Sequence, residues 1–413
     1  MIGVIAASVN SGDTAFILVC AALVMLMTPG LAFFYGGLVR RKNFLAIMMQ
    51  SFISMGVVTT IWVFVGYSLA FSGGAGGFIG NLHWFALNHV GQKPGPWAPT
   101  IPGIAHFVYM EMFAIITPAL ITGAFADRVK FKSYLWFLVL WSLLVYIPFV
   151  HWIWGGGFLA KHGVLDFAGG MVVHVSAGFA ALASVFVVGK RKFSPGERHL
   201  PHNVAFVALG AGLLWFGWFG FNGGSSLAAN GAAAQAWINT DVAGSIAMCA
   251  WLAISWWREG KPSLVGALTG AVAGLACVTP AAGYIPIWAA FIVGLLAGSI
   301  CYGAVMLVKR LKWDDALDVW ACHGVGGLLG SILLGVFAYK SINAAGANGV
   351  LAGGAKFLGW QVLAVVITAA YAFVVTYLIL KFLNLFGSVR VPDSIEEKGL
   401  DEAEFGETAY DMT

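Results

Sequence analysis

Two histidines are the residues of this 413-residue chain with the clearest capacity for chemistry. His174 stands in the run MVVHVSAG and His323 in VWACHGVGG, so apolar and small residues surround both. A neutral imidazole offers one hydrogen-bond donor and one acceptor, and it can take up a proton near neutral pH. Two such rings placed together could form a polar line through an apolar interior, where they would bond a small molecule or pass a proton. Two unrelated structural histidines, each bonded to backbone, are the alternative.

Aromatic residues could add a gate and a cation site. Phe221 stands in GWFGFN, where glycines let backbones approach, and Phe113 stands in another apolar run. Trp154, in HWIWGGG, could hold a cation on its ring face, an interaction worth about 0.5–2 kcal/mol. From the sequence alone, ordinary packing is favoured for both phenylalanines. A place in the interfacial aromatic belt is favoured for Trp154, one of 17 tryptophans.

Acidic and hydroxyl side chains flank these aromatic runs. Asp166 follows a glycine-rich loop and could cap the next helix, or lend negative potential to a cation vestibule. Ser225 ends the run that holds Phe221 and could accept a hydrogen bond from a cation. Glu111 lies inside an apolar run, and its role stays open between a vestibule charge and a lipid-facing side chain. Asp314 and Asp315 are interpreted as acids at a helix N-terminus, where they suit the macrodipole.

Composition predicts the elements that hold these residues. Hydrophobic residues make up 60% of the chain and charged residues 10%, against about a quarter charged in soluble domains. No soluble core could bury that much apolar surface, so we predict an all-α integral membrane protein in contact with lipid. The net charge of +4 gives no reason to expect nucleic acid as a partner. No metal-ligand cluster or nucleophile set stands out, so we expect no enzyme, no metal and no cofactor.

Eleven apolar runs are long enough to cross a bilayer as helices, which takes about 20 residues each. Together they form a membrane domain over residues 1–386, followed by a polar, acidic cytoplasmic tail over 387–413. The runs lie at 14–38, 44–71, 101–125, 133–154, 167–189, 203–225, 236–257, 263–280, 284–308, 319–338 and 357–386.

The basic residues test this count of spans. Of 22 lysines and arginines, 18 fall in alternate loops and the tail, and the opposite loops hold only Lys93, Lys161, Lys340 and Lys356. By the positive-inside rule the N-terminus is outside and the C-terminus is cytoplasmic, which requires an odd number of spans. We therefore expect a multi-pass protein of the plasma or inner membrane.

Short similarities indicate an internal repeat. FFYGG ends the first run and FGFNGG ends the sixth, while HVSAG lies in the fifth and HGVGG in the tenth. Five spans per repeat is an odd number, so the two repeats must have inverted topology, with the eleventh helix left over. Inverted repeats place a pathway at their interface near the midplane. His174 and His323 would meet there.

These motifs together resemble the Amt/Mep/Rh family, and its bacterial ammonium transporters most closely. The resemblance covers nearly the whole chain. It is carried by TPGLAFFYGGL (28–38), FAIITPALITGAFADRVKF (113–131), WGGGFLAKHGVLDFAGGMVVHVSAG (154–178), WFGFNGGS (218–225), GKPSLVGALTGAVAGLACVTPAAGYI (260–285), DDALDVWACHGVGG (314–327), RVP (390–392) and GLD (399–401).

The resemblance assigns roles that composition and spacing do not. It makes the two histidines, His174 and His323, the paired histidines of a pore. It implies a stacked aromatic gate formed by Phe113 and Phe221. It implies an outer ammonium site formed by Trp154, Ser225 and the ring of Tyr109 or Phe113, with Asp166 as a supporting buried acid.

The function implied by the resemblance is ammonium transport by a homotrimer with one pore in each subunit. NH4+ would be recruited outside and deprotonated, and NH3 would cross along the histidines, with separate proton transfer giving net electrogenic uptake. PII-family signal proteins could plug the pore at the cytoplasmic face. The alternatives are a passive NH3 or CO2 channel of the Rh kind and an ammonium-sensing transporter.

Overall fold

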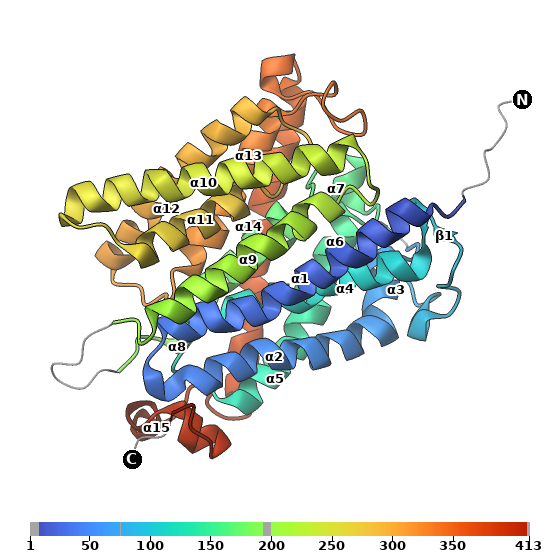
Figure 1. Cartoon of the computed structure of the whole chain (residues 1–413). Coiled ribbons are helices and arrows are strands. Elements are labelled where there is room, and N and C mark those ends of the chain that lie inside the picture. The colour runs from blue at the N-terminus through green and yellow to red at the C-terminus, as the bar shows by residue number, and fades with distance from the viewer. Residues whose placement is uncertain (1–7, 75, 193–199, 411–413) are drawn as a thin grey trace, which may run out of the picture.

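The computed structural model describes residues 8–74, 76–192 and 200–410, which form one bundle of long helices (Figure 1). Within these residues, ten helical segments are at least 18 residues long and apolar enough to cross a membrane. A further apolar helix, α11 (Leu264–Val278), has 15 residues. It is shorter than the predicted run 263–280 because Pro280 lacks the N–H that would continue the helical ladder. The predicted all-helical membrane architecture is confirmed.

The predicted runs correspond to the observed segments, with bounds that differ by a few residues. The largest shift is at the start of α10, where the Asn230 side chain accepts from the Ala233 N–H and caps the helix at Gly231. The segments before that point are α1 (Ser11–Leu38), α2 (Phe44–Ile61) continued by η2 (Trp62–Gly66) and α3 (Tyr67–Phe71), α4 (Gly103–Ile121), α5 (Phe131–Trp141) continued by η5 (Ser142–Tyr146) and α6 (Ile147–Ile153), η6 (Gly170–Val175) continued by α8 (Ser176–Val188), and α9 (Val204–Gly224). Those that follow are α10 (Gly231–Glu259), α11, α12 (Ile287–Leu311), η7 (Trp320–Val325) continued by α13 (Gly326–Phe337), and α14 (Ala355–Leu385).

Short elements complete the chain between and beyond the membrane helices. The loop before α4 contains a small antiparallel pair of strands, β1 (Pro94–Gly95) and β2 (Ala98–Pro102). The other short elements are η1 (Arg41–Asn43), η3 (Phe85–Leu87), η4 (Thr122–Ala124), α7 (Phe158–Lys161), η8 (Val350–Ala352), α15 (Asp393–Lys398) and η9 (Asp401–Phe405).

Helices α1 and α9 lie side by side in the bundle, and glycine permits their close approach (Figure 1). A methyl group on Gly210 would lie 2.2 Å from the backbone nitrogen of Phe34. One on Gly30 would lie 2.9 Å from the Cβ atom of Leu213. Small residues at helix interfaces are typical of membrane bundles, where lipid tails are as apolar as the side chains. Large apolar side chains such as Phe216 and Leu378 instead face outward.

Two segments with π-helical turns, η6 and η7, cross near the centre of the bundle and carry the two histidines. A methyl group on Gly178 would lie 2.1 Å from the Gly324 nitrogen, and one on Gly327 would lie 2.7 Å from the Cβ atom of His174. The glycines that follow each histidine therefore let the two backbones touch. π-Helical turns are rare and frequently mark functional sites.

The tail after α14 is an ordered cap on the ends of α2 and α5 (Figure 1). Asp401 accepts hydrogen bonds from the backbone N–H groups of Leu45 and Ala46, at 3.0 and 2.8 Å. Glu404 accepts one from the Phe131 N–H at 3.0 Å. These carboxylates satisfy the unpaired donors at two helix N-termini, where negative charge is favoured. Two of the acidic residues of the tail thus attach it to the N-terminal ends of α2 and α5.

The macrodipole interpretation is right for Asp315 and wrong for Asp314. Asp315 accepts from the Trp320 N–H at 2.7 Å, at the start of η7. Asp314 faces two arginines, because Arg191 Nη2 lies 2.7 Å and Arg128 Nη1 2.8 Å from its oxygens. Burial alone would raise the pKa of Asp314, but the hydrogen bond from Arg191 and the charge of Arg128 lower it to about 2.

Candidate functional site

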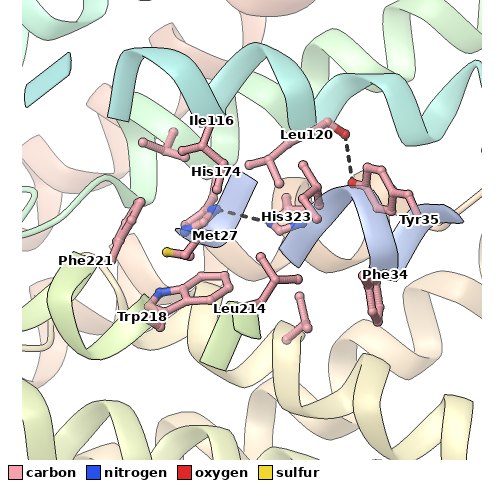
Figure 2. Close-up of a pocket in the computed structure, with 13 residues that line it drawn as sticks. Met27, Phe34, Tyr35, Ile116, Leu120, His174, Leu214, Trp218, Phe221 and His323 are labelled. Carbon is pink, nitrogen blue, oxygen red and sulfur yellow. Dashed lines mark hydrogen bonds between the residues drawn. The ribbon is translucent and has the colours of Figure 1, made fainter. Parts of the chain in front are cut away.

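The two histidines lie next to each other in the middle of the bundle (Figure 2). Their Nδ1 atoms are 3.2 Å apart, and the ring centroids are 5.2 Å apart with an 18° angle between planes. His174 is 1% exposed and His323 4%. A neutral imidazole carries one N–H, so one Nδ1 donates to the other. The structure thus brings together the pair that the sequence placed in separate apolar runs.

The histidines border a narrow and mostly apolar cavity (Figure 2). Its volume is about 10 Å³, roughly the space that one water-sized molecule occupies. His174 Nε2 is buried and has no hydrogen-bond partner among the described residues. The remaining lining is Met27, Leu31, Phe34, Tyr35, Ile116, Leu120, Val173, Leu214, Trp218, Phe221 and Val272.

Trp218 shapes this cavity, although the sequence analysis did not single it out. Its indole stacks on His174 with centroids 5.5 Å apart and planes at 24°. Its Nε1 donates to Thr279 Oγ1 at 2.9 Å, which fixes the ring. Thr279 lies in the turn that ends α11. This helix therefore holds the Trp218 ring in place as part of the cavity lining. With 17 tryptophans in the chain, the sequence offered no signal that separates this one.

Phe221 lines the cavity on one side, and Phe113 packs against the Phe221 ring. Their ring centroids are 4.2 Å apart, with planes at 31°. Both side chains are almost completely buried. The Phe221 ring also lies 6.0 Å from the His174 ring, so the aromatic pair and the histidine pair follow each other along one line.

Beyond the phenylalanines lie Trp154, Tyr109 and Ser225. The Trp154 ring meets Phe113 edge-on, with centroids 5.8 Å apart and planes at 89°. Its Nε1 donates to the Asp166 carbonyl at 2.8 Å, which holds the indole face in one orientation. The Tyr109 hydroxyl donates to the Phe221 carbonyl at 2.8 Å and lies 3.2 Å from Ser225 Oγ. The structure therefore brings together all the residues proposed for the outer site.

Asp166 acts as a helix cap in this structure. Its two carboxylate oxygens accept four backbone N–H groups at 2.6–3.1 Å, donated by Gly169, Gly170, Met171 and Val172. The side chain is 5% exposed. Because the four donors occupy both oxygens, Asp166 positions η6, and hence His174, and it also carries negative charge near the Trp154 indole. Of the two interpretations of Asp166, capping is the one with direct contacts.

Glu111 does not line the narrow cavity beside the histidines. On α4 it lies two positions from Tyr109 and two positions from Phe113, about half a turn around the helix. It is 7% exposed. The expectation of a lipid-facing side chain is therefore wrong, because Glu111 is buried, and a vestibule charge stays a prediction.

A second cavity, of about 270 Å³, opens on the side of the histidines away from the phenylalanines. Tyr35 and His323 line both cavities. The second one is much more polar. Its charged lining consists of Arg40, Asp127, Arg191, Lys309 and Asp318.

Comparison with known proteins gives consistent matches over nearly the whole chain. The family model described as Ammonium Transporter Family matches residues 15–410. A Bacillus subtilis protein named ammonium transporter is 46% identical over 97% of this chain and 98% of its own length. An Archaeoglobus fulgidus protein named ammonium transporter Amt1 is 44% identical over 97% and 100% of the two lengths. The crystal structure of Saccharomyces cerevisiae Mep2 superposes with a TM-score of 0.86 at 36% identity, covering 93% of this chain and 91% of that one.

Proposed function

The chain belongs to the ammonium transporter family, and from this premise we propose that it recruits NH4+, deprotonates it and conducts NH3 and the proton separately. The observation that carries the proposal is the order of groups along one line. An indole face, a closed pair of phenyl rings and two bonded imidazoles succeed one another. Each group suits one step of the process.

Recruitment falls to Trp154, Ser225 and the rings of Tyr109 and Phe113. The Trp154 face attracts a cation through the ring quadrupole, which is worth about 0.5–2 kcal/mol. Ser225 Oγ can accept a hydrogen bond from NH4+, and K+ has no N–H to offer. The negative charge of Asp166, whose backbone carbonyl accepts from the Trp154 indole, adds electrostatic attraction for the cation. Hydrogen-bond donation, and not size, is therefore the basis for selecting NH4+ over K+.

The phenyl pair and the apolar cavity favour passage of the neutral species. A full charge would lose its hydration in a space of about 10 Å³ lined mostly by carbon, at a cost of many kcal/mol. NH3 carries no such penalty and can bond the imidazoles. Amines hold their proton up to about pH 10, so deprotonation at neutral pH is uphill and needs coupling to proton transfer.

The histidine pair offers the proton a route. His174 Nδ1 and His323 Nδ1 share one hydrogen bond, and His174 Nε2 has no partner among the described residues. A proton that arrives at Nε2 can be passed on as the shared Nδ1 proton moves between the rings. Net transport is then one charge for each NH4+, which makes uptake electrogenic.

The architecture that supports this function is eleven spans arranged as two inverted five-helix repeats and a final helix. Counting α11 as a short span preserves the charge alternation, which places the N-terminus outside and the tail in the cytoplasm. The repeat is supported by the two crossing π-helical segments, each with one histidine eight positions after an aspartate. We also propose a homotrimer in the plasma or inner membrane, open to PII-family proteins at the cytoplasmic face.

A passive NH3 channel is the second candidate, because the same narrow apolar cavity would admit NH3 alone. Current recording on a solid-supported membrane separates the two. We expect purified protein in liposomes to give currents with ammonium and smaller ones with methylammonium, and none with potassium. Ammonia-driven alkalinisation of the vesicles without any current would instead indicate the passive channel.

A further inference from the structure

The turn that carries Trp154 is covered by a loop that the proposed mechanism does not use. Trp154 ends α6, and Gly155, Gly156 and Gly157 follow it. Three glycines in a row bring no side chain that would fix their backbone, and glycine has more conformational freedom to lose than any other residue. Contacts from outside the turn must therefore keep Trp154 in place.

Hydrogen bonds to the end of α6 supply part of this restraint. The Trp154 N–H donates to the Val150 carbonyl at 2.8 Å. The Gly157 N–H donates to the His151 carbonyl, also at 2.8 Å. Gly156, between them, has a left-handed backbone with a φ of 74° and takes part in neither of these two bonds.

Trp97 covers Gly156. A methyl group on Gly156 would lie 2.9 Å from the Cη2 atom of the Trp97 indole, so the ring and the glycine backbone are in contact. Trp97 is half-buried and stands in the turn between β1 and β2. Figure 1 shows β1 at the end of the bundle where α1 begins. By the charge alternation this is the outer end, where ammonium would arrive.

The last turn of α3 anchors the Trp97 indole. Trp97 Nε1 donates to the Phe71 carbonyl at 2.8 Å, and the two ring centroids are 5.9 Å apart. Phe71 is 2% exposed and meets the His106 ring edge-on at 4.9 Å, which makes it a fixed support. The Ala70 carbonyl accepts from His151 Nδ1 at 2.9 Å. The end of α3 thus holds both Trp97 and the helix that leads to Trp154.

The Trp154 side chain has one hydrogen bond of its own. Its Nε1 donates to the Asp166 carbonyl at 2.8 Å, and its ring meets Phe113 edge-on. A single bond at the edge of the indole does not stop the ring from pivoting when its backbone moves. The direction of the indole face therefore depends on the glycine turn, and the turn depends on Trp97.

We propose that Trp97 is a positioning residue of the outer ammonium site. This inference rests on the proposed recruitment of NH4+ by Trp154. By covering Gly156 and bonding α3, Trp97 keeps the turn in the conformation that presents the Trp154 indole face to the cation. Without Trp97 only a fraction of the molecules presents that face, and the apparent affinity falls by the same fraction. The steps beyond the phenyl pair do not involve the turn, so the maximal current is unchanged.

The first test compares Trp97→Leu and Trp97→Phe with wild-type protein in liposomes, by current recording over a range of ammonium concentrations. Leucine removes the N–H and the ring, so we expect the half-saturating concentration to rise roughly 3- to 10-fold, the scale of one net hydrogen bond, at wild-type maximal current. Phenylalanine keeps a ring but has no N–H, so its value should lie between the other two. A wild-type half-saturating concentration in Trp97→Leu would overturn the inference, and so would a fall in maximal current alone.

The matched control is Trp84→Leu, which removes another half-buried indole from the same loop. Trp84 stacks on Tyr67 of α3, with centroids 5.7 Å apart. Both leucine variants should lower the thermal unfolding midpoint, because each loses aromatic packing. Only Trp97→Leu should change the half-saturating concentration. An equal change in Trp84→Leu would mean that general loosening of the loop causes the effect, and the inference would fail.

Gly156→Ala provides a second test, which a purely structural role of Trp97 would not pass. The added methyl meets the Trp97 ring, so it should raise the half-saturating concentration in the wild-type background. In Trp97→Leu the ring is gone, and the same substitution should add much less. The strain of alanine at a φ of 74° is present in both backgrounds and cancels in the comparison. Additive effects would show that Trp97 does not act through Gly156.

Titration separates this inference from the proposed function. Isothermal titration of the detergent-purified proteins with ammonium chloride, referenced to potassium chloride, measures recruitment without transport. Ammonium binding by the wild-type protein without any current would overturn electrogenic transport, and the titration would still compare the variants. Equal dissociation constants for wild type and Trp97→Leu would overturn the role of Trp97, whatever the currents show.

Discussion

Gly178 and Gly324 touch backbone to backbone, and this contact sets the distance between the two histidines. A methyl group added to Gly178 would lie 2.1 Å from the Gly324 nitrogen and 2.2 Å from its Cα atom. Each glycine lies within four positions of a histidine, in the segments that cross at the centre of the bundle. The hydrogen bond between the rings therefore depends on residues that bear no functional group.

Gly178→Ala should separate the histidines and destabilise the protein. The clash is with backbone atoms, which cannot rotate away, so we expect a cost of about 1–3 kcal/mol and loss of most ammonium current. Thermal unfolding in detergent and current recording would measure the two effects. Gly303→Ala in α12 is the control, because its added methyl meets no atom within 4 Å. A Gly178→Ala protein with wild-type stability and current would contradict the packing argument.

Asp166→Ala should be more damaging than Asp166→Asn. Alanine leaves four N–H groups without an acceptor, and each buried unsatisfied donor costs about 1–3 kcal/mol. Asparagine keeps one acceptor oxygen and similar volume, so part of the cap survives. The comparison is the thermal unfolding midpoint of the two variants. Equal midpoints for alanine and wild type would show that the cap contributes nothing.

Trp154→Leu should weaken ammonium binding while preserving the fold. Loss of about 0.5–2 kcal/mol of cation–π attraction corresponds to roughly a 2- to 30-fold higher half-saturating ammonium concentration. Currents recorded over a range of ammonium concentrations give this value directly. Trp257→Leu, at a residue that is 85% exposed, should not change it. If both variants behave alike, Trp154 belongs to the aromatic belt, as the sequence alone favoured.

The ion pairs of Asp314 should make stability depend on pH in acid. The pKa of Asp314 lies near 2, below its ordinary value of 3.8, so the ionised form stabilises the fold above about pH 4. That contribution is lost as the pH falls through about 2. At 1.36 kcal/mol per pH unit it amounts to about 2 kcal/mol.

Asp314→Asn should therefore lower the thermal midpoint at pH 7 and flatten its decline in acid. Asp393→Asn, at an exposed tail residue, serves as the control. A variant that keeps the wild-type midpoint at pH 7 would show that the arginine contacts do not stabilise the protein.

The sequence predicted the helices and the histidine pair for physical reasons. Apolar runs of about 20 residues with basic residues in alternate loops have few alternatives to membrane spans. His174 and His323 stood out because ionisable residues inside such runs are rare. The gate and the outer site could not be separated from ordinary packing in this way. For Phe113, Phe221 and Trp154 the sequence alone favoured packing or the aromatic belt, and only the family resemblance favoured a functional role.

Contacts between distant residues explain what the sequence analysis missed. Asp314 bonds Arg191 and Arg128, which lie 123 and 186 positions away, so nothing in its local sequence indicates them. Trp218 is one tryptophan of many until its ring is seen on His174. The role of Glu111 stayed open because a single residue inside an apolar run has no periodic pattern that identifies its face.

The central claim is that the bonded histidines carry both NH3 and the proton. It is tested most directly by ammonium and potassium currents of His174→Ala beside wild-type protein in the same liposomes. The account predicts that the variant loses the ammonium current, or admits potassium if the enlarged cavity fills with water. Full ammonium current with wild-type selectivity over potassium in His174→Ala would contradict the account.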